Sequence, residues 1–187
     1  MKLTNQFTAF LAIITLSLFS YNLQAQAKYN LQKTEIVFNS KTPVETIRAV
    51  NNNAQGIVAT GKNIFLVRVP IQAFKFKRRL QQTHFNENYM ESNKYPNATY
   101  RGKIEGNYSL SKDGVYKVTT KGDLTIHGVK KARTVPATIT VKNGVATLST
   151  SFKVKPKEHG IKIPKVVTEK IAEEIGVSIK AELKVRK

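Results

Sequence analysis

Alternation of apolar and polar side chains with a period of two residues runs through most of this chain, and it constrains the fold more than any other feature. In the segment 146–154, mostly apolar residues alternate with threonine, serine and lysine. In Val177–Arg186, valine, isoleucine, alanine and leucine alternate with serine, lysine, glutamate and arginine. A period of two is that of a half-buried β-strand, so the sequence predicts an all-β fold.

Short turns that contain glycine separate the alternating segments. Asn143-Gly144 and Asp113-Gly114 each lie between two such segments. Both residue types tolerate the positive φ of a type I′ turn, which joins antiparallel strands in a hairpin. Thr60–Asn63 is expected to connect two further strands in the same way. The strands are therefore expected to pair antiparallel along the chain.

We expect about eight strands that close into an antiparallel β-barrel, which is just wide enough for one elongated ligand. A filled β-sandwich is the alternative. Pro43–Ala49 is ambiguous between a helical turn and the entry to a strand. The expected strands cover residues 28–39, 55–60, 64–71, 98–110, 115–127, 137–141, 146–154 and 177–186.

Two short helices are expected beside the strands. Phe76, Leu80 and His84 recur at intervals of four residues and predict a short amphipathic helix. A second helix is expected to open at Pro164, with Val167, Ile171 and Ile175 on one face, and to stop at Gly176.

The strand that begins at Ile64 is apolar on both faces, with the sequence Ile-Phe-Leu-Val-Arg-Val over residues 64–69. An isolated two-layer sandwich would normally present a polar outer face. We therefore expect this strand to have a cavity or core on one side and a covering helix or loop on the other.

The longest interruption of the strand pattern is His84–Ile104, where polar turn formers alternate with large apolar or aromatic side chains. A simple surface loop would not need so much ring and thioether area. We interpret the segment as a lid or end closure over the mouth of an apolar barrel interior.

The first 27 residues have the features of a secretory signal peptide. A basic start at Lys2 precedes a largely apolar run from Phe7 to Leu23, and Ala25-Gln26-Ala27 is an A-x-A cleavage pattern. We expect cleavage after Ala27, leaving a single domain over residues 28–187 that is soluble in the periplasm or secreted. The chain has no cysteine, so its core must stabilise the fold without disulfides.

Removal of Lys2 leaves 30 basic against 12 acidic residues, a net charge of +18. Such a charge attracts anionic partners, including a membrane surface, although many lysines alternate with apolar residues as on a solvated outer face. The cluster Phe74–Arg79 interleaves aromatic and basic residues as nucleic-acid platforms do. Export from the cytoplasm makes nucleic acid an improbable partner. The oligomeric state stays open, with a homodimer as one alternative.

The sequence offers little for catalysis. His84, His127 and His159 lie far apart and have no metal-ligand spacing, and no nucleophile-elbow, phosphate-loop or dinucleotide motif occurs. We expect no enzyme activity, no metal and no cofactor. His127 precedes a glycine turn, where it would either bond a ligand headgroup or fix the turn through a backbone carbonyl.

Three segments together resemble the YceI-like family of secreted lipid-binding proteins: His84–Ile104, Gly122–Lys131 (Gly-Asp-Leu-Thr-Ile-His-Gly-Val-Lys-Lys) and Ile161–Pro164 (Ile-Lys-Ile-Pro). Their order and spacing match, and the resemblance covers essentially the whole mature chain. Lys130 stands where many members carry threonine, and Ala132-Arg133 follows where proline is common.

The resemblance implies a lipocalin-like antiparallel barrel that holds a long isoprenoid chain, of the polyprenyl or quinone type, without catalytic residues. Alternation and ring size suggest which side chains would form its wall, lid and polar fixtures. The candidates are Phe38, Phe65, Val67, Phe74, Phe76, Leu80, Phe85, Tyr89, Met90, Tyr100, Ile126, His127, Leu148, Phe152, Ile179 and Leu183, with His127 and Tyr89 as the polar fixtures.

Two hypotheses from different classes follow. The first is a periplasmic, non-catalytic carrier or reservoir for a long isoprenoid lipid held in the barrel lumen. The second is a basic interaction module with a solid core that docks on anionic envelope surfaces. Charge supports both, so only the state of the interior discriminates between them.

Overall fold

The computed structural model describes residues 27–186, which form ten strands and one short α-helix, α2 (Arg79–His84). The strands are β1 (Lys28–Lys41), β2 (Thr46–Asn51), β3 (Gln55–Ala59), β4 (Ile64–Pro70), β5 (Lys75–Phe76), β6 (Asn97–Glu105), β7 (Gly114–Ile126), β8 (Val129–Lys142), β9 (Val145–Val154) and β10 (Ile175–Val185).

The strands close into an antiparallel barrel of eight members. Each strand pairs with the next in the order β1, β3, β4, β6, β7, β8, β9 and β10, and β10 returns to pair with β1. Asn30 of β1 lies opposite Lys184 of β10 in this closing pair. β2 pairs with the later half of β1 and β3 with its start, so β2 and β3 act as one bent strand. The predicted all-β barrel is confirmed, and Pro43–Ala49 leads into a strand rather than a helical turn.

A pair of glycines lets β6 and β7 approach very closely on the inner wall. Gly102 lies opposite Gly122 in the ladder. A Cβ atom added to Gly102 would lie 2.0 Å from the carbonyl oxygen of Lys121, and one added to Gly122 would lie 2.0 Å from that of Arg101. Only glycine fits such a contact, which permits the tight curvature that a small barrel requires.

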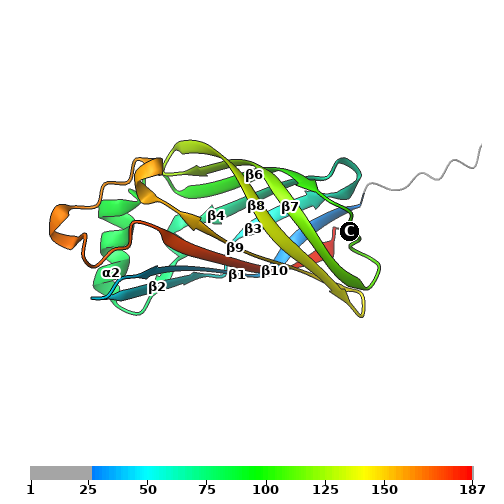
Figure 1. Ribbon diagram of the computed structural model, residues 1–187, viewed down its shortest axis with the longest axis horizontal. Coiled ribbons are helices and arrows are strands. Elements are labelled where there is room, and N and C mark those ends of the chain that lie inside the picture. Colours follow the sequence, from blue (N-terminus) through cyan, green and yellow to red (C-terminus); the bar gives the residue numbers. More distant parts are fainter. Residues whose placement is uncertain (1–26, 187) are drawn as a thin grey trace, which may run out of the picture.

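One end of the barrel, here called the closed end, carries the turn at residues 60–63, the loop at 106–113 and the turn at 143–144. Figure 1 shows the C-terminus of the chain at this end. The turn Asn143-Gly144 has positive φ at both residues, 52° and 75°, as its sequence predicts. Buried side chains from strands and loop fill the interior here, and they include Tyr29, Leu110, Val141 and Ala146.

The opposite end, here called the open end, is formed by the β1–β2 turn, the segment with α2, and the loop between β9 and β10. Figure 1 shows α2 and this loop at the end remote from the C-terminus. A π-helical turn, Phe85–Tyr89, directly continues α2. The lid interpretation therefore applies at most to the first part of His84–Ile104, because residues from Asn97 onward belong to β6.

The second predicted helix is wrong. After Pro164 the chain makes only a 3₁₀ turn at Lys165–Val167, and β10 already begins at Ile175. Ile175 and Gly176 pair with Val154 and Lys153 of β9. The β-branched residues in this segment favour helix weakly, whereas the ladder with β9 supplies hydrogen bonds that an isolated short helix lacks.

Three other expectations also need correction. The first helix begins at Arg79 rather than near Phe76, which lies in β5. The strand expected over 98–110 ends at Glu105, because the following loop turns Leu110 into the core. The outer face of β4 is not covered: Ile64 and Leu66 are 41% and 47% exposed.

The predicted signal peptide lies outside the described residues, apart from Ala27. Within residues 27–186, no helix combines the length and the apolar composition that crossing a bilayer would require.

Candidate functional site

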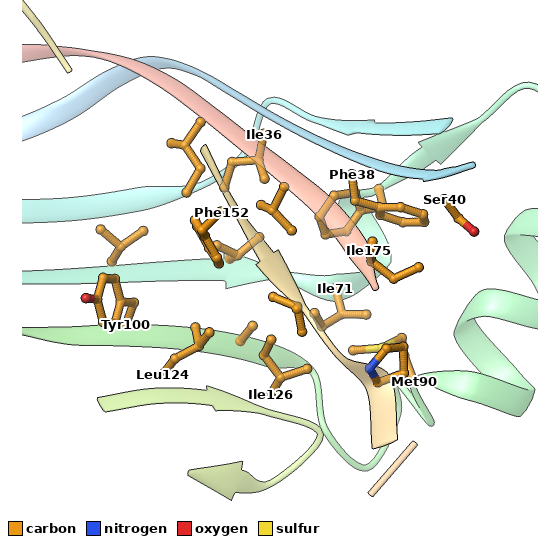
Figure 2. A pocket seen from close by; sticks show the side chains of 18 of the residues that line it. Ile36, Phe38, Ser40, Ile71, Met90, Tyr100, Leu124, Ile126, Phe152 and Ile175 are labelled. Carbon is orange, nitrogen blue, oxygen red and sulfur yellow. The ribbon is translucent and has the colours of Figure 1, made fainter. Parts of the chain in front are cut away.

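A cavity of about 500 Å³ occupies the barrel lumen, within the range of small-molecule sites. Alternation along each strand directs every second side chain inward, so one face of nearly every strand lines it. Along β7 the lining runs from Val118 to Ile126, which is roughly 26 Å of strand at 3.3 Å per residue. Figure 2 shows Ile36, Phe38 and Phe152 directed into the cavity, with Leu124 and Ile126 across from them. The cavity is long, apolar and enclosed by the sheet.

Four phenylalanines form a cluster toward the open end. The ring of Phe38 lies 5.5 Å from Phe74, 5.4 Å from Phe76 and 5.3 Å from Phe85, measured between centroids. Phe85 also lies 5.0 Å from Phe76 and 5.7 Å from Phe74. Such tilted, edge-on and stacked contacts stabilise aromatic groups beyond their burial alone. The cluster joins β1, β5 and the π-helical turn around the cavity.

Tyr100 brings a hydroxyl group to the middle of the lumen wall. Its ring packs against Phe65 with centroids 4.7 Å apart. Its hydroxyl lies 3.1 Å from the carbonyl oxygen of Thr120 and 3.2 Å from that of Arg133. Burial raises the pKa of the Tyr100 hydroxyl above its ordinary value, while the hydrogen bond with Thr120 acts in the opposite direction. The group is neutral near pH 7 and bonded to the wall.

Charge enters the cavity lining only at the open end. The lining there includes the charged side chains of Glu45, Arg78 and Lys170 and the imidazole of His84. The guanidinium of Arg78 donates to Glu45 Oε1 at 3.4 Å, and Gln81 Nε2 donates to the same oxygen at 2.9 Å. The rest of the lining is predominantly apolar. The arrangement suits a ligand with an apolar chain in the lumen and a polar group at the open end.

The structure brings fifteen of the sixteen candidate residues to the cavity lining. These are Phe38, Phe65, Val67, Phe74, Phe76, Leu80, Phe85, Tyr89, Met90, Tyr100, Ile126, Leu148, Phe152, Ile179 and Leu183. Tyr89, predicted as a polar fixture, lies in this lining, and burial raises the pKa of its hydroxyl.

His127 is absent from the lining and instead fastens two segments of the chain. Its Nε2 lies 2.7 Å from Glu91 Oε2, its Nδ1 lies 3.3 Å from the carbonyl oxygen of His159, and its ring contacts Tyr95 at 4.4 Å between centroids. Both polar partners are acceptors, so only a protonated ring donates to both at once. This matches the alternative in which His127 bonds a backbone carbonyl and fixes the turn with Gly128.

His159 is the most deeply buried titratable side chain near this turn. It has no solvent exposure, its Nδ1 donates to the carbonyl oxygen of Val129 at 3.1 Å, and its Nε2 is buried without a partner. Burial lowers the pKa of the His159 ring, which the hydrogen bond to Val129 opposes. His159 is therefore a neutral structural group that ties the loop after β9 to β8.

Smaller aliphatic residues make up much of the lining that was not predicted. Ile36, Ile71, Leu124, Ile161 and Ile163 all line the cavity. Ile36 and Leu124 share a strand face with predicted residues, so alternation alone could have identified them. The others come from irregular segments, for which the sequence carries no periodic signal.

Within residues 27–186, no three His, Cys, Asp or Glu side chains gather closely enough to hold a metal ion. The chemistry that the cavity offers is apolar contact with a few hydroxyl and amide groups. It can enclose a ligand, and the charged groups at its mouth can contact a polar end.

Solved structures with the same fold extend across most of the chain. The polyisoprenoid-binding domain from Saccharophagus degradans, implicated in plant cell wall breakdown, superposes with a TM-score of 0.71 at 10% identity, covering 86% of this chain and 99% of that one. BcnA of Burkholderia cenocepacia gives 0.67 at 17% identity, covering 80% and 96%. A YceI protein of Campylobacter jejuni gives 0.51 at 20% identity, covering 66% and 72%.

Among curated protein sequences, none matches this chain. The three structures are each under 25% identical, so they establish a shared fold. The family model described as the YceI-like domain matches residues 27–183, nearly the whole of the part that the structure describes. The chain therefore belongs to the YceI-like domain family.

Proposed function

We propose that the protein is a non-catalytic carrier or reservoir that holds one long-chain isoprenoid lipid, of the polyprenyl or quinone type, in the barrel lumen. The observation that carries the proposal is the cavity itself, which is long, apolar and charged only at its open end. The polyisoprenoid-binding domain from Saccharophagus degradans shares the fold of this chain. The A-x-A pattern at Ala25–Ala27 supports a periplasmic location.

The energetics favour a long apolar chain as the ligand. Each buried methylene contributes roughly 0.8 kcal/mol before the cost of ordering the chain is subtracted. Affinity is therefore expected to rise with chain length until the lumen is filled. A polar or anionic head would remain at the open end, where Arg78 and Lys170 line the mouth.

The alternative, a basic docking module, requires a solid core. A lumen of about 500 Å³ lined mainly by apolar side chains favours the carrier over a solid module. An empty apolar cavity of that size forfeits dispersion contacts that a bound chain would restore.

Native mass spectrometry of the mature protein, purified gently from its own envelope and followed by organic extraction, tests the proposal. A discrete mass excess that extracts as a polyprenyl or quinone species is expected. A bare polypeptide mass, with no uptake of added isoprenoids, would overturn the carrier function.

A variant pair sharpens the same measurement. Phe152→Gln places an amide on the lumen wall, which is costly to bury without a partner, so this variant is expected to lose the lipid while keeping the fold. Phe152→Leu keeps the wall apolar and serves as the matched control. Lipid retained at full stoichiometry by Phe152→Gln would contradict a lumenal site.

A further inference from the structure

The open end exposes large apolar side chains around the cavity mouth. Val44, Leu80 and Val166 are 60%, 65% and 86% exposed. They come from three separate segments, namely the β1–β2 turn, α2 and the loop between β9 and β10. Single exposed apolar residues are ordinary, but several around one opening indicate an interaction surface. We call these three residues the apolar rim.

Hydrogen bonds hold the three segments around the same opening. Arg78 and Gln81 of the α2 segment both donate to Glu45 of the β1–β2 turn. The amide of Ala172 in the β9–β10 loop donates to Ser40 Oγ at 2.8 Å. Leu80 both lines the cavity and stands exposed at its mouth. The apolar rim is thus continuous with the lumen wall.

Each rim segment also carries exposed basic side chains. Lys77 and Arg79 precede Leu80, Lys165 precedes Val166, and Lys41 ends β1 beside the turn that carries Val44. Among the ion pairs of the described residues, none involves Lys77, Arg79, Lys165 or Lys170. Glu87 and Glu169 are exposed in the same segments, so charges of both signs are present, with more basic than acidic side chains over the three segments together. Exposed apolar side chains among basic ones are what bind a protein to the interface of an anionic bilayer.

We propose that the open end docks on an anionic lipid bilayer, with the apolar rim inserted among the headgroups and the basic side chains against lipid phosphates. This orientation places the cavity mouth against the acyl region, so an apolar chain would enter the lumen without crossing water. Docking depends only on the apolar rim and the basic side chains around it, whereas its role in lipid entry rests on the proposed carrier function.

The closed end provides an internal control for this orientation. Val115 and Val145 are 68% and 50% exposed there, and Lys117 and Lys142 are exposed nearby. Charge and exposed valine are therefore present at both ends. Only at the open end do they surround an opening into the lumen.

Co-sedimentation with vesicles tests the proposal. The double variant Val44→Asp with Val166→Asp and the double variant Val115→Asp with Val145→Asp each lower the net charge by the same amount. Binding to phosphatidylglycerol–phosphatidylethanolamine vesicles is expected to weaken at least about fivefold for the open-end variant and less than about twofold for the closed-end variant. Binding should also be weak on phosphatidylcholine and fall in 1 M salt, where screening shortens to about 3 Å.

Three results would overturn the proposal: no binding by the wild-type protein, equal losses in the two variants, or loss of a dimer by the open-end variant. The third, measured by sedimentation velocity without vesicles, would assign the rim to a second copy of the chain. Circular dichroism confirms that each variant is folded. Phe152→Gln separates the two proposals, because it should lose the lumenal lipid yet still bind vesicles.

Discussion

The two ends of one barrel use their aromatic residues differently. At the closed end Tyr29, Tyr108 and Tyr116 pack against the core, and two of their hydroxyls donate to surface groups: Tyr108 to Asn63 Oδ1 at 3.0 Å, and Tyr116 to the carbonyl oxygen of Lys112 at 2.9 Å. At the open end the corresponding volume belongs to a cluster of phenylalanines, which have no polar anchor and face a cavity.

The difference indicates that the closed end seals the barrel and that the open end provides an apolar surface for a ligand. A tyrosine buries its ring and bonds a loop with its hydroxyl, so the loop seals the barrel. A phenylalanine offers only an apolar surface, which an apolar ligand can cover instead of protein. Stability is therefore expected to depend mainly on the closed end, and ligand binding on the lumen and the open end.

The largest expected effect is a contrast between two leucines. Leu110 is buried in the sealed core, whereas Leu148 is half-buried and faces the cavity. Leu110→Ala should destabilise the protein by about 2–4 kcal/mol, since a new void forms in close-packed surroundings. Leu148→Ala should cost only about 1–2 kcal/mol, because a half-buried side chain has less apolar surface removed from water than a fully buried one. Urea denaturation of lipid-free protein measures both, and equal losses would mean that the cavity wall and the sealed core do not differ in packing.

The next largest effect is expected in the pH dependence of stability, which His159 near the open end should cause. Its pKa is lowered in the folded state by burial, so below the unfolded pKa of about 6.5 the unfolded chain binds the extra proton. Stability should then fall with decreasing pH by up to about 1.4 kcal/mol per unit. Urea midpoints between pH 7 and 5 should decline more steeply for the wild type than for His159→Asn. Parallel slopes would show that His159 does not carry this sensitivity.

The smallest effects are expected from single polar contacts at each end. Glu91→Gln weakens the contact with His127, and Tyr108→Phe removes the hydroxyl that donates to Asn63. Because both groups are partly exposed, each loss should be about 0.5–1.5 kcal/mol. Only Glu91→Gln should also accelerate hydrogen exchange in residues 85–95, because His127 ties that segment to the β7–β8 turn. Unchanged hydrogen exchange in residues 85–95 would show that His127 does not hold this segment in place.

The fold could be predicted largely from the sequence because successive residues of a β-strand point to opposite faces of the sheet, so apolar and polar residues alternate. Alternation predicts the strands 146–154 and 177–186, and Asn143-Gly144 predicts the hairpin turn before the first of them. The prediction failed where tertiary contacts override local pattern. The segment before Gly176 was expected to be helical, but from Ile175 onward it pairs with β9. The loop after β6 that carries Leu110 has no periodic pattern to show that it fills the end of the barrel.

The lumen wall could be predicted in part for the same reason, since ring size and alternation selected residues that do line it. The sequence does not show which end of the barrel gives access to the cavity. His127 resembled a headgroup contact because histidine and a glycine turn commonly occur at sites. Its partners Glu91 and His159 are 36 and 32 residues away along the chain, and only the assembled fold brings them together.

The pairing of β1 with β10 sets when the molecule can fold. Each ladder between neighbouring strands forms from segments close along the chain, but the closing ladder joins Asn30 to Lys184. Until the last strand is available, β1 and β9 each keep a free edge that can pair with foreign strands. Contacts of such long sequence separation form slowly. A chain in which β10 has not yet paired therefore stays an open sheet with free edges, and the barrel closes only when β10 joins β1.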